Sequence, residues 1–163
     1  MSSGAERALA ALEESGIPYA VTRHGRVGSL AEAAAARGVE PRDIVKTLVV
    51  RRGEDDYLFV LVPGDREISW QLLRAHLGVS RLSMPDAAAA KEATGYERGT
   101  ITPFGAAHTG SDGPWPVIAD STLVGRTVSL GAGAHGVAVT VHADDVITAL
   151  GAEVADVTEP AGP

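Results

Sequence analysis

The chain has 163 residues, of which 45% are hydrophobic and 21% charged, as expected for one ordinary globular domain. It contains no cysteine, which excludes disulfide scaffolds, cysteine nucleophiles and cysteine-based zinc sites. Its formal net charge of -7 is unusual for a nucleic-acid-binding domain, so such a partner would need a local basic patch. The sequence offers five arginines for that patch, each of which could equally be a solvated surface residue: Arg23, Arg26, Arg51, Arg52 and Arg98.

The start of the chain and its apolar runs predict a soluble, cytoplasmic protein without a membrane partner. Residues 1–7 (MSSGAER) lack the basic start and apolar stretch of a signal peptide. The most apolar run, Tyr57 to Pro63, is far shorter than the roughly 20 residues that cross a bilayer.

Signals for helices and strands alternate in the first half of the chain. Capping boxes of the form S-x-x-E at Ser3 and Ser29 each open a helix, and Gly16 and Gly38 are placed to end these helices. A charged turn at 53–56 is expected to join two strands as a hairpin. The β-branched runs predict strands at 19–23, 44–51 and 57–62.

The second half continues this mixture around one long irregular segment. Residues 95–116 are rich in Gly, Pro, Thr and Ser, and so long an irregular stretch in a compact domain is usually functional. Helices are expected at 69–77, 86–94 and 143–150, and strands at 117–119, 127–130 and 137–141.

Together these elements predict a mixed α/β (α+β) fold in a single domain. We expect a central mixed sheet with flanking helices. The domain is expected to span residues 1–163, with its core at about 5–157 and a loose tail at 158–163.

Lys46 is one of only two lysines and stands in an unusual place. Alternation along the predicted strand puts it on one face with Ile44, Leu48 and Val50. A lysine among aliphatic side chains is unfavourable unless its ammonium reaches water, a partner or an anionic ligand. It is therefore either a lysine that extends to solvent at the strand edge or a ligand-binding residue.

The segment from Gly95 to Gly105 (GYERGTITPFG) is a second candidate for chemistry. Its glycines allow positive φ angles and let a ligand approach the backbone, whose N–H groups can bind an anion or oxyanion. Thr100 and Thr102 add hydroxyl groups. A plain surface loop is the alternative interpretation.

The segment from Gly131 to Gly136 (GAGAHG) matches the G-x-G-x-x-G dinucleotide fingerprint but lacks its context. That fingerprint requires a following helix, whereas a strand-like run, VAVTV, follows here. We therefore predict a glycine-rich hairpin turn whose backbone can line a pocket.

None of the five histidines forms a metal-spaced pair, and there is no G-x-S-x-G elbow, so we predict no metal and no cofactor. His76 lies on a predicted helix and is expected to be structural. His24 and His135 each stand beside a glycine in a turn region, where a ligand-binding role is possible.

Several segments, in their order and spacing, resemble the YbaK / prolyl-tRNA-synthetase-associated domain family. The resemblance covers about residues 5–157 and is most telling at the lysine-bearing strand IVKTLV. The other segments that carry it are HGRVGSLAEA at 24–33, LVPGD at 61–65, TGYERGTITPFG at 94–105, PVIAD at 116–120, the hairpin at 131–141 and ADDV at 143–146.

The resemblance implies a deacylase that hydrolyses the ester of mischarged aminoacyl-tRNA in trans, often a small amino acid on prolyl-tRNA. The implied partners are the 3′ acceptor end of aminoacyl-tRNA and, as a candidate, prolyl-tRNA synthetase. Lys46 is the implied catalytic residue, with the terminal ribose hydroxyl of the tRNA and a bound water in place of a protein nucleophile. The expected substrate-binding residues are His24, Thr47, Gly99, Thr100, Thr102, Pro103, Phe104, Gly105, Gly131, Gly133 and His135.

Two departures from the family pattern leave the amino-acid preference open. Thr100 stands where some of these deacylases have a second glycine, and His135 stands at a position that is often basic. An alternative function is a non-catalytic module that binds a tRNA end or a nucleotide. A third is a regulatory interaction domain with a decayed site.

Overall fold

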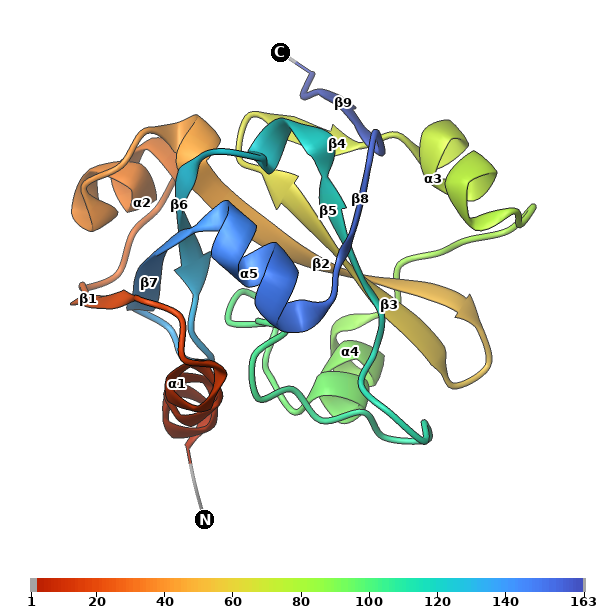
Figure 1. Ribbon diagram of the computed structural model, residues 1–163, viewed down its shortest axis with the longest axis horizontal. Helices are drawn as coiled ribbons and strands as arrows, with labels where there is room; N and C mark the ends of the chain where they lie inside the picture. The colour runs from red at the N-terminus through yellow and green to blue at the C-terminus, as the bar shows by residue number, and fades with distance from the viewer. Residues whose placement is uncertain (1–2, 163) are drawn as a thin grey trace.

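The computed structural model describes residues 3–162, which form a seven-stranded mixed sheet with helices on both faces and a small two-stranded sheet at one end (Figure 1). The strand order is β1-β7-β6-β2-β3-β5-β8 in the large sheet and β4-β9 in the small one. The strands are β1 (Ala20–Arg23), β2 (Ile44–Gly53), β3 (Asp56–Pro63), β4 (Arg66–Ile68), β5 (Val117–Asp120), β6 (Thr127–Gly131), β7 (Val137–His142), β8 (Glu153–Ala155) and β9 (Thr158–Pro160).

Each α-helix is closed at both ends by its own sequence. Side chains at the N-caps, among them Ser3, Ser29, Ser69 and Asp86, accept backbone hydrogen bonds, and a left-handed glycine follows every helix. No helix within residues 3–162 is long and apolar enough to span a membrane. The α-helices are α1 (Gly4–Ser15), α2 (Leu30–Arg37), α3 (Trp70–Leu77), α4 (Ala87–Thr94) and α5 (Ala143–Leu150), with 3-10 turns η1 (Pro41–Asp43) and η2 (Ser121–Leu123).

Strand β3 separates two hydrophobic cores because its side chains alternate between the faces of the sheet. Phe59 and Leu61 belong to the larger core, which α1, α4 and α5 cover. Val60 and Val62 belong to the smaller core, which α3 covers from the other side. All four of these side chains are almost fully buried, as expected for a central strand packed on both faces.

One edge of strand β2 is left unpaired over part of its length, and the cavity described below lies at this unpaired edge. β2 pairs with β3 from Val45 to Gly53, but with β6 only at Ile44 and Val45. Farther along, Arg51 forms an isolated bridge with Ser83. Between these contacts, residues 46–50 have no strand partner on that side among residues 3–162.

The predicted fold class, helices and hairpin are confirmed, including the pairing of β2 with β3. The Gly131–Gly136 segment is the β6–β7 turn, as its strand-like flank indicated. The sequence did not predict the short strands β4, β8 and β9. The expectation of a loose tail at 158–163 was wrong for Thr158–Pro160, because β9 pairs with β4 and Thr158 is buried; Pro163 lies outside the described residues.

Candidate functional site

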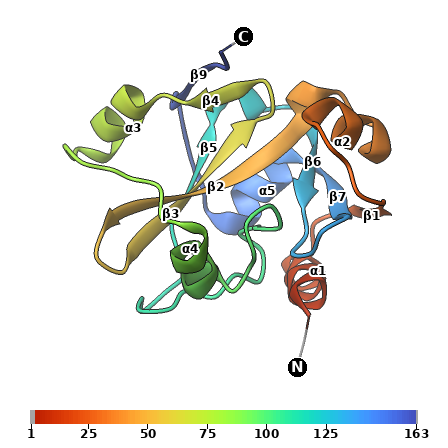
Figure 2. The same ribbon diagram turned by 180° about the vertical axis from the view of Figure 1, so that it is seen from behind.

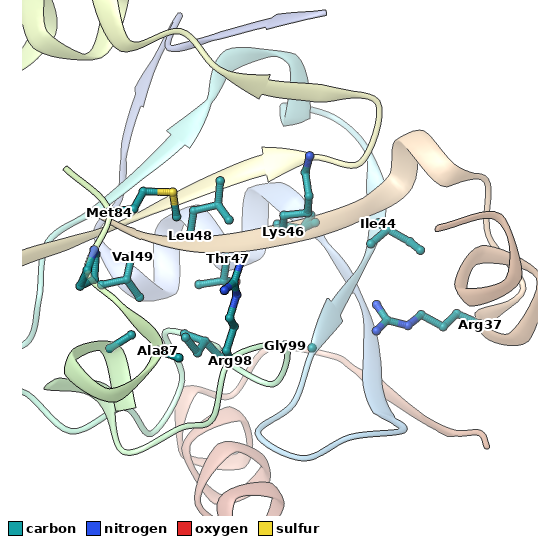
Figure 3. A pocket seen from close by; sticks show the side chains of 15 residues that line it. Arg37, Ile44, Lys46, Thr47, Leu48, Val49, Met84, Ala87, Arg98 and Gly99 are labelled. Carbon is teal, nitrogen blue, oxygen red and sulfur yellow. The ribbon is translucent and has the colours of Figure 1, made fainter. Parts of the chain in front are cut away.

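A cavity of about 560 Å³ lies at the open edge of β2, between this strand, the start of α4 and the glycine loop that follows α4 (Figure 3). Both sides of β2 contribute to its wall because the cavity borders the strand edge. Its lining residues are Arg37, residues 44–49, Met84, Pro85, Ala87, Ala90, Arg98, Gly99, Ile101 and Gly131.

All the charged side chains that line the cavity are positive. Arg37 comes from α2, Lys46 from β2 and Arg98 from the loop after α4, and no Asp or Glu lines the cavity. Within residues 3–162, none of the three has a carboxylate within ion-pair distance. A chain of net charge -7 therefore has a locally positive cavity, which favours an anionic ligand.

Lys46 lines the cavity at the strand edge, and its ammonium reaches a backbone carbonyl. Nζ donates to the oxygen of Arg66 at 2.6 Å, which leaves the other ammonium protons for another acceptor. Its side chain leaves β2 on the side opposite to Thr47, Arg98 and Gly99 (Figure 3). Burial lowers the pKa of Lys46, and the nearby carboxylates of Glu67 and Asp65 oppose that shift.

Arg37 is a partly buried cation with few partners. Its Nη1 lies 3.4 Å from Ser129 Oγ, a long hydrogen bond, and its buried Nε has no partner in the described structure. Burial lowers the pKa of this guanidinium. An unpaired buried guanidinium is unfavourable by itself and favourable beside an anion, so this end of the cavity suits a phosphate or carboxylate.

Thr47 places a hydroxyl on the side of β2 that faces Arg98 and Gly99 (Figure 3). Its Oγ1 is buried and has no hydrogen-bond partner in the described structure. A buried hydroxyl without a partner costs free energy, and a ligand in the cavity could remove that cost.

The glycine loop divides into cavity residues and core residues. Gly99, with φ 89°, and Ile101 line the cavity. Thr100 and Thr102 are buried and bond within the loop, to Glu97 O and Phe104 N. Phe104 belongs to the larger core, and neither it nor Pro103 lines the cavity. Of the loop residues expected to bind substrate, only Gly99 lies in the cavity wall.

The glycines at 105 and 133 are required by the packing of α1. A Cβ on Gly105 would collide with the carbonyl of Arg7, and one on Gly133 with the carbonyl of Gly4. Both have positive φ angles, and neither lines the cavity. Of the two glycines expected from the hairpin turn, only Gly131 lies in the cavity wall.

His24 and His135 line a second cleft, together with Arg26. His24 Nε2 is buried without a partner, and its Nδ1 lies 2.8 Å from the carbonyl oxygen of Gly25. His135 adjoins Gly99, since its Cε1 is 3.6 Å from the position of a Cβ on that glycine. The two expected histidines therefore line the same second cleft. This cleft adjoins the cavity, but neither histidine lines the cavity itself.

The model of the aminoacyl-tRNA editing domain matches residues 24–149 of this chain. The chain belongs to the aminoacyl-tRNA editing domain family. This confirms the resemblance inferred from the sequence, and the match includes all three cations of the cavity.

Relatives of this editing domain occur within larger enzymes and as separate chains. The proline–tRNA ligases of Thermosipho africanus and Thermosipho melanesiensis are 39% identical over 80 residues and 45% over 58. These matches cover 49% and 36% of the domain, but only 14% and 10% of the ligases.

Among solved structures, a candidate trans-editing enzyme for prolyl tRNA synthetase is similar over nearly the whole editing domain, with a TM-score of 0.83 and 27% identity. This similarity covers 98% of the domain and 99% of that chain. A hypothetical protein of known crystal structure has a TM-score of 0.83 and 26% identity, over 94% of the domain and 100% of that chain.

Sequence reasoning missed Arg37 and the small apolar wall of the editing domain's cavity. Arg37 stands in the last turn of α2, where a basic residue is ordinary because it favours the helix dipole. Ala87 and Ala90 lie on α4, for which the sequence predicted a helix but no part in a cavity. The available signal was the alanine content of α4, which leaves space beside β2.

Proposed function

We propose that this editing domain hydrolyses the ester bond of mischarged aminoacyl-tRNA in trans, with a small non-cognate amino acid on prolyl-tRNA as its substrate, in the cytoplasm. The observation that carries the proposal is the cavity at the β2 edge: three cations line it and no carboxylate does. The family assignment supplies the substrate class, since a tRNA 3′ end carries phosphate, ribose and the aminoacyl ester.

In this proposal the cations hold the terminal nucleotide. Arg37 lies at the Ile44 end of the cavity and would bind the phosphate of this nucleotide through charge-assisted hydrogen bonds. The Lys46 ammonium lies on the other side of β2 and would contact the nucleotide at the strand edge. Arg98 lies across the cavity, near Thr47, and would contact the ribose or the ester oxygen. The backbone at Gly99 and Gly131 would approach the ester carbonyl closely, because neither residue has a side chain to block it.

The chemistry proposed here uses no protein nucleophile. The cavity wall contains no Ser, Cys or His, and Thr47 is its only hydroxyl. A water would attack the carbonyl carbon, the bond to the ribose oxygen would break, and that oxygen would take up a proton. An aminoacyl ester is already activated, so positioning the water and stabilising the oxyanion are sufficient tasks for the site.

The amino-acid side chain would lie against the apolar wall. Val49, Ala87, Ala90 and Ile101 line this part of the cavity. Such a wall admits a small apolar side chain and offers no partner to a charged one, which would lose its hydration there. We expect steric exclusion of large side chains, with alanine as the first substrate to test.

The alternative function is a module that binds a tRNA end without hydrolysing it. One observation favours it, because no carboxylate or imidazole lines the cavity to act as a general base. Prolyl-tRNA synthetase remains a candidate partner under either function. Both functions predict that the domain binds a tRNA end, but only the deacylase function predicts that it releases the amino acid.

The deciding experiment is incubation with a panel of tRNAs mischarged with alanine, serine, cysteine or valine, scoring release of the amino acid above the spontaneous rate. The enzyme hypothesis predicts multiple turnovers on at least one small amino acid and no release from correctly charged prolyl-tRNA. Binding of the same tRNAs with release at the spontaneous rate would establish the non-catalytic module instead.

A further inference from the structure

A groove of about 440 Å³ is lined by residues of β2, of α3 and of the segment that leads from α3 to α4. Figure 2 shows these elements together near the far end of the β2–β3 hairpin. The groove contains four of the twelve arginines in the chain, and no Asp or Glu lines it. We call it the arginine groove; its polar lining residues are Arg51, Arg52, Arg74, Arg81, Ser80 and Ser83.

Most of the positive charge in the arginine groove is uncompensated. Arg52 pairs with Asp56, at 3.1 Å between Nη2 and Oδ1. Within residues 3–162, no carboxylate lies within ion-pair distance of Arg51, Arg74 or Arg81. Like charges that converge on one concave surface repel one another, so a polyanion is the ligand that this arrangement favours.

The arginine groove adjoins the cavity through two segments. Arg51 and Ser83 exchange backbone hydrogen bonds of 2.7 and 3.1 Å, which fixes the two walls of the groove to each other. The next residue, Met84, lines the cavity, and so does Val49, two residues before Arg51. The groove therefore begins roughly 7 Å along β2 from the cavity wall.

We propose that the arginine groove binds backbone phosphates of the tRNA acceptor arm, adjacent to the terminal nucleotide. This rests on the proposed function, because the cavity fixes where the 3′ end lies. Guanidinium groups match phosphate geometry, and contacts to phosphates position an RNA without reading its sequence. The groove has Leu82 as its only large apolar side chain, so it offers little to the base or ring of a small metabolite.

The test compares substrates that differ only in the RNA outside the cavity. The variant Arg74→Gln/Arg81→Gln removes two groove charges. Arg23→Gln/Arg42→Gln removes two exposed charges elsewhere, and Arg74→Lys/Arg81→Lys keeps the charge of the groove. Each is measured for deacylation of alanyl-tRNA and of 3′-O-alanyl-adenosine, and for binding of uncharged tRNA at several salt concentrations.

The expected result is at least about 10-fold weaker tRNA binding in the Gln groove variant, with a salt dependence shallower by about two counterions. Its turnover of alanyl-adenosine stays at the wild-type value, and the Lys variant retains most of the binding. Wild-type tRNA affinity in the Gln groove variant overturns the proposal, as does an equal loss in the Arg23/Arg42 control.

The binding measurement separates this proposal from the deacylase function. If the wild-type protein binds tRNA through the arginine groove and releases no amino acid, the deacylase function is wrong but the groove proposal is supported. If the wild-type protein deacylates alanyl-tRNA and the groove variants do so equally well, the groove proposal fails alone. If the Gln groove variant loses turnover of 3′-O-alanyl-adenosine but keeps tRNA binding, the groove is a small-ligand site and the groove proposal is also overturned.

Discussion

Lys46 on β2 donates a hydrogen bond from Nζ to the backbone carbonyl oxygen of Arg66 on β4, 2.6 Å away. The Arg66 side chain in turn bonds to Thr158 on β9, from Nε to Oγ1 at 2.7 Å and from Nη2 to the carbonyl oxygen at 3.1 Å. The orientation of the central lysine therefore depends on the small β4–β9 sheet, which lies outside the cavity.

The first prediction concerns Thr158 as a positioning residue for Lys46. Thr158→Val removes the hydroxyl that accepts from Arg66 while it keeps the side-chain shape, so β4 should be held less firmly. Deacylation should fall about 3- to 10-fold, the equivalent of one ordinary hydrogen bond, with Thr158→Ser close to wild type. Equal activity of the Val and Ser variants would show that β4 holds Lys46 without this contact.

The second prediction is a pH dependence of stability from Lys46. Burial lowers its folded pKa below the ordinary value of 10.5, so between the two values the unfolded chain binds more protons than the folded one. Stability relative to Lys46→Met should therefore rise as pH increases through the folded pKa, and level off near 10.5. The measurement is the free energy of unfolding of both proteins against pH; a constant difference between them would contradict the shift.

The third prediction separates stability from activity at Thr47. Thr47→Val replaces a buried hydroxyl that has no partner, so the free energy of unfolding should rise by about 1 kcal/mol. Deacylation should fall roughly 10-fold if the hydroxyl contacts the substrate, and Thr47→Ser should retain most of it. A destabilised Val variant would mean that the hydroxyl has a partner in the folded protein.

The fourth prediction contrasts two glycines with positive φ angles. Gly133→Ala places a Cβ against the Gly4 carbonyl and should lower stability by about 3 kcal/mol or more. Gly99→Ala has no such collision and should cost about 1 kcal/mol from its φ of 89°. Deacylation measured well below both melting temperatures should fall further in the Gly99 variant, which alters the cavity wall. A larger loss of activity in the Gly133 variant would instead place the site at the β6–β7 turn.

Much of the fold could be predicted from the sequence because its signals are local. Ser3 and Ser29 cap the helices that their S-x-x-E patterns indicated, and the charged turn at 53–56 lies between β2 and β3. Strands β4 and β9 have three residues each, and their partners are about 90 positions apart. No local sequence pattern predicts such a pairing. The hydrogen bond from Lys46 to the Arg66 carbonyl on β4 therefore could not be predicted from the sequence.

A residue of the candidate cavity could be singled out from the sequence where it contrasts with its neighbours, and not elsewhere. Lys46 stood out because it shares a strand face with aliphatic residues. Thr102 was a candidate because its loop is rich in glycine, and Phe104 because of the family resemblance, but neither signal tells which side chains turn into the core. Arg37 and Arg74 resemble ordinary surface arginines until the fold brings them to a concave surface.

The fifth prediction concerns Lys46 and tests the central claim, that the cavity at the β2 edge is where the aminoacyl ester is hydrolysed. The measurement is the rate of alanine release from mischarged prolyl-tRNA by the wild type, Lys46→Ala and Lys46→Arg, with the melting temperature of each. We expect Lys46→Ala to lose about 30- to 1000-fold in rate, because a charge-assisted contact that acts in the transition state is removed. Lys46→Arg should recover little, since a planar guanidinium cannot replace a compact ammonium. Melting temperatures should change little, because an ammonium beside Leu48 and Val50 adds little stability. Wild-type rates in folded Lys46→Ala would contradict the account.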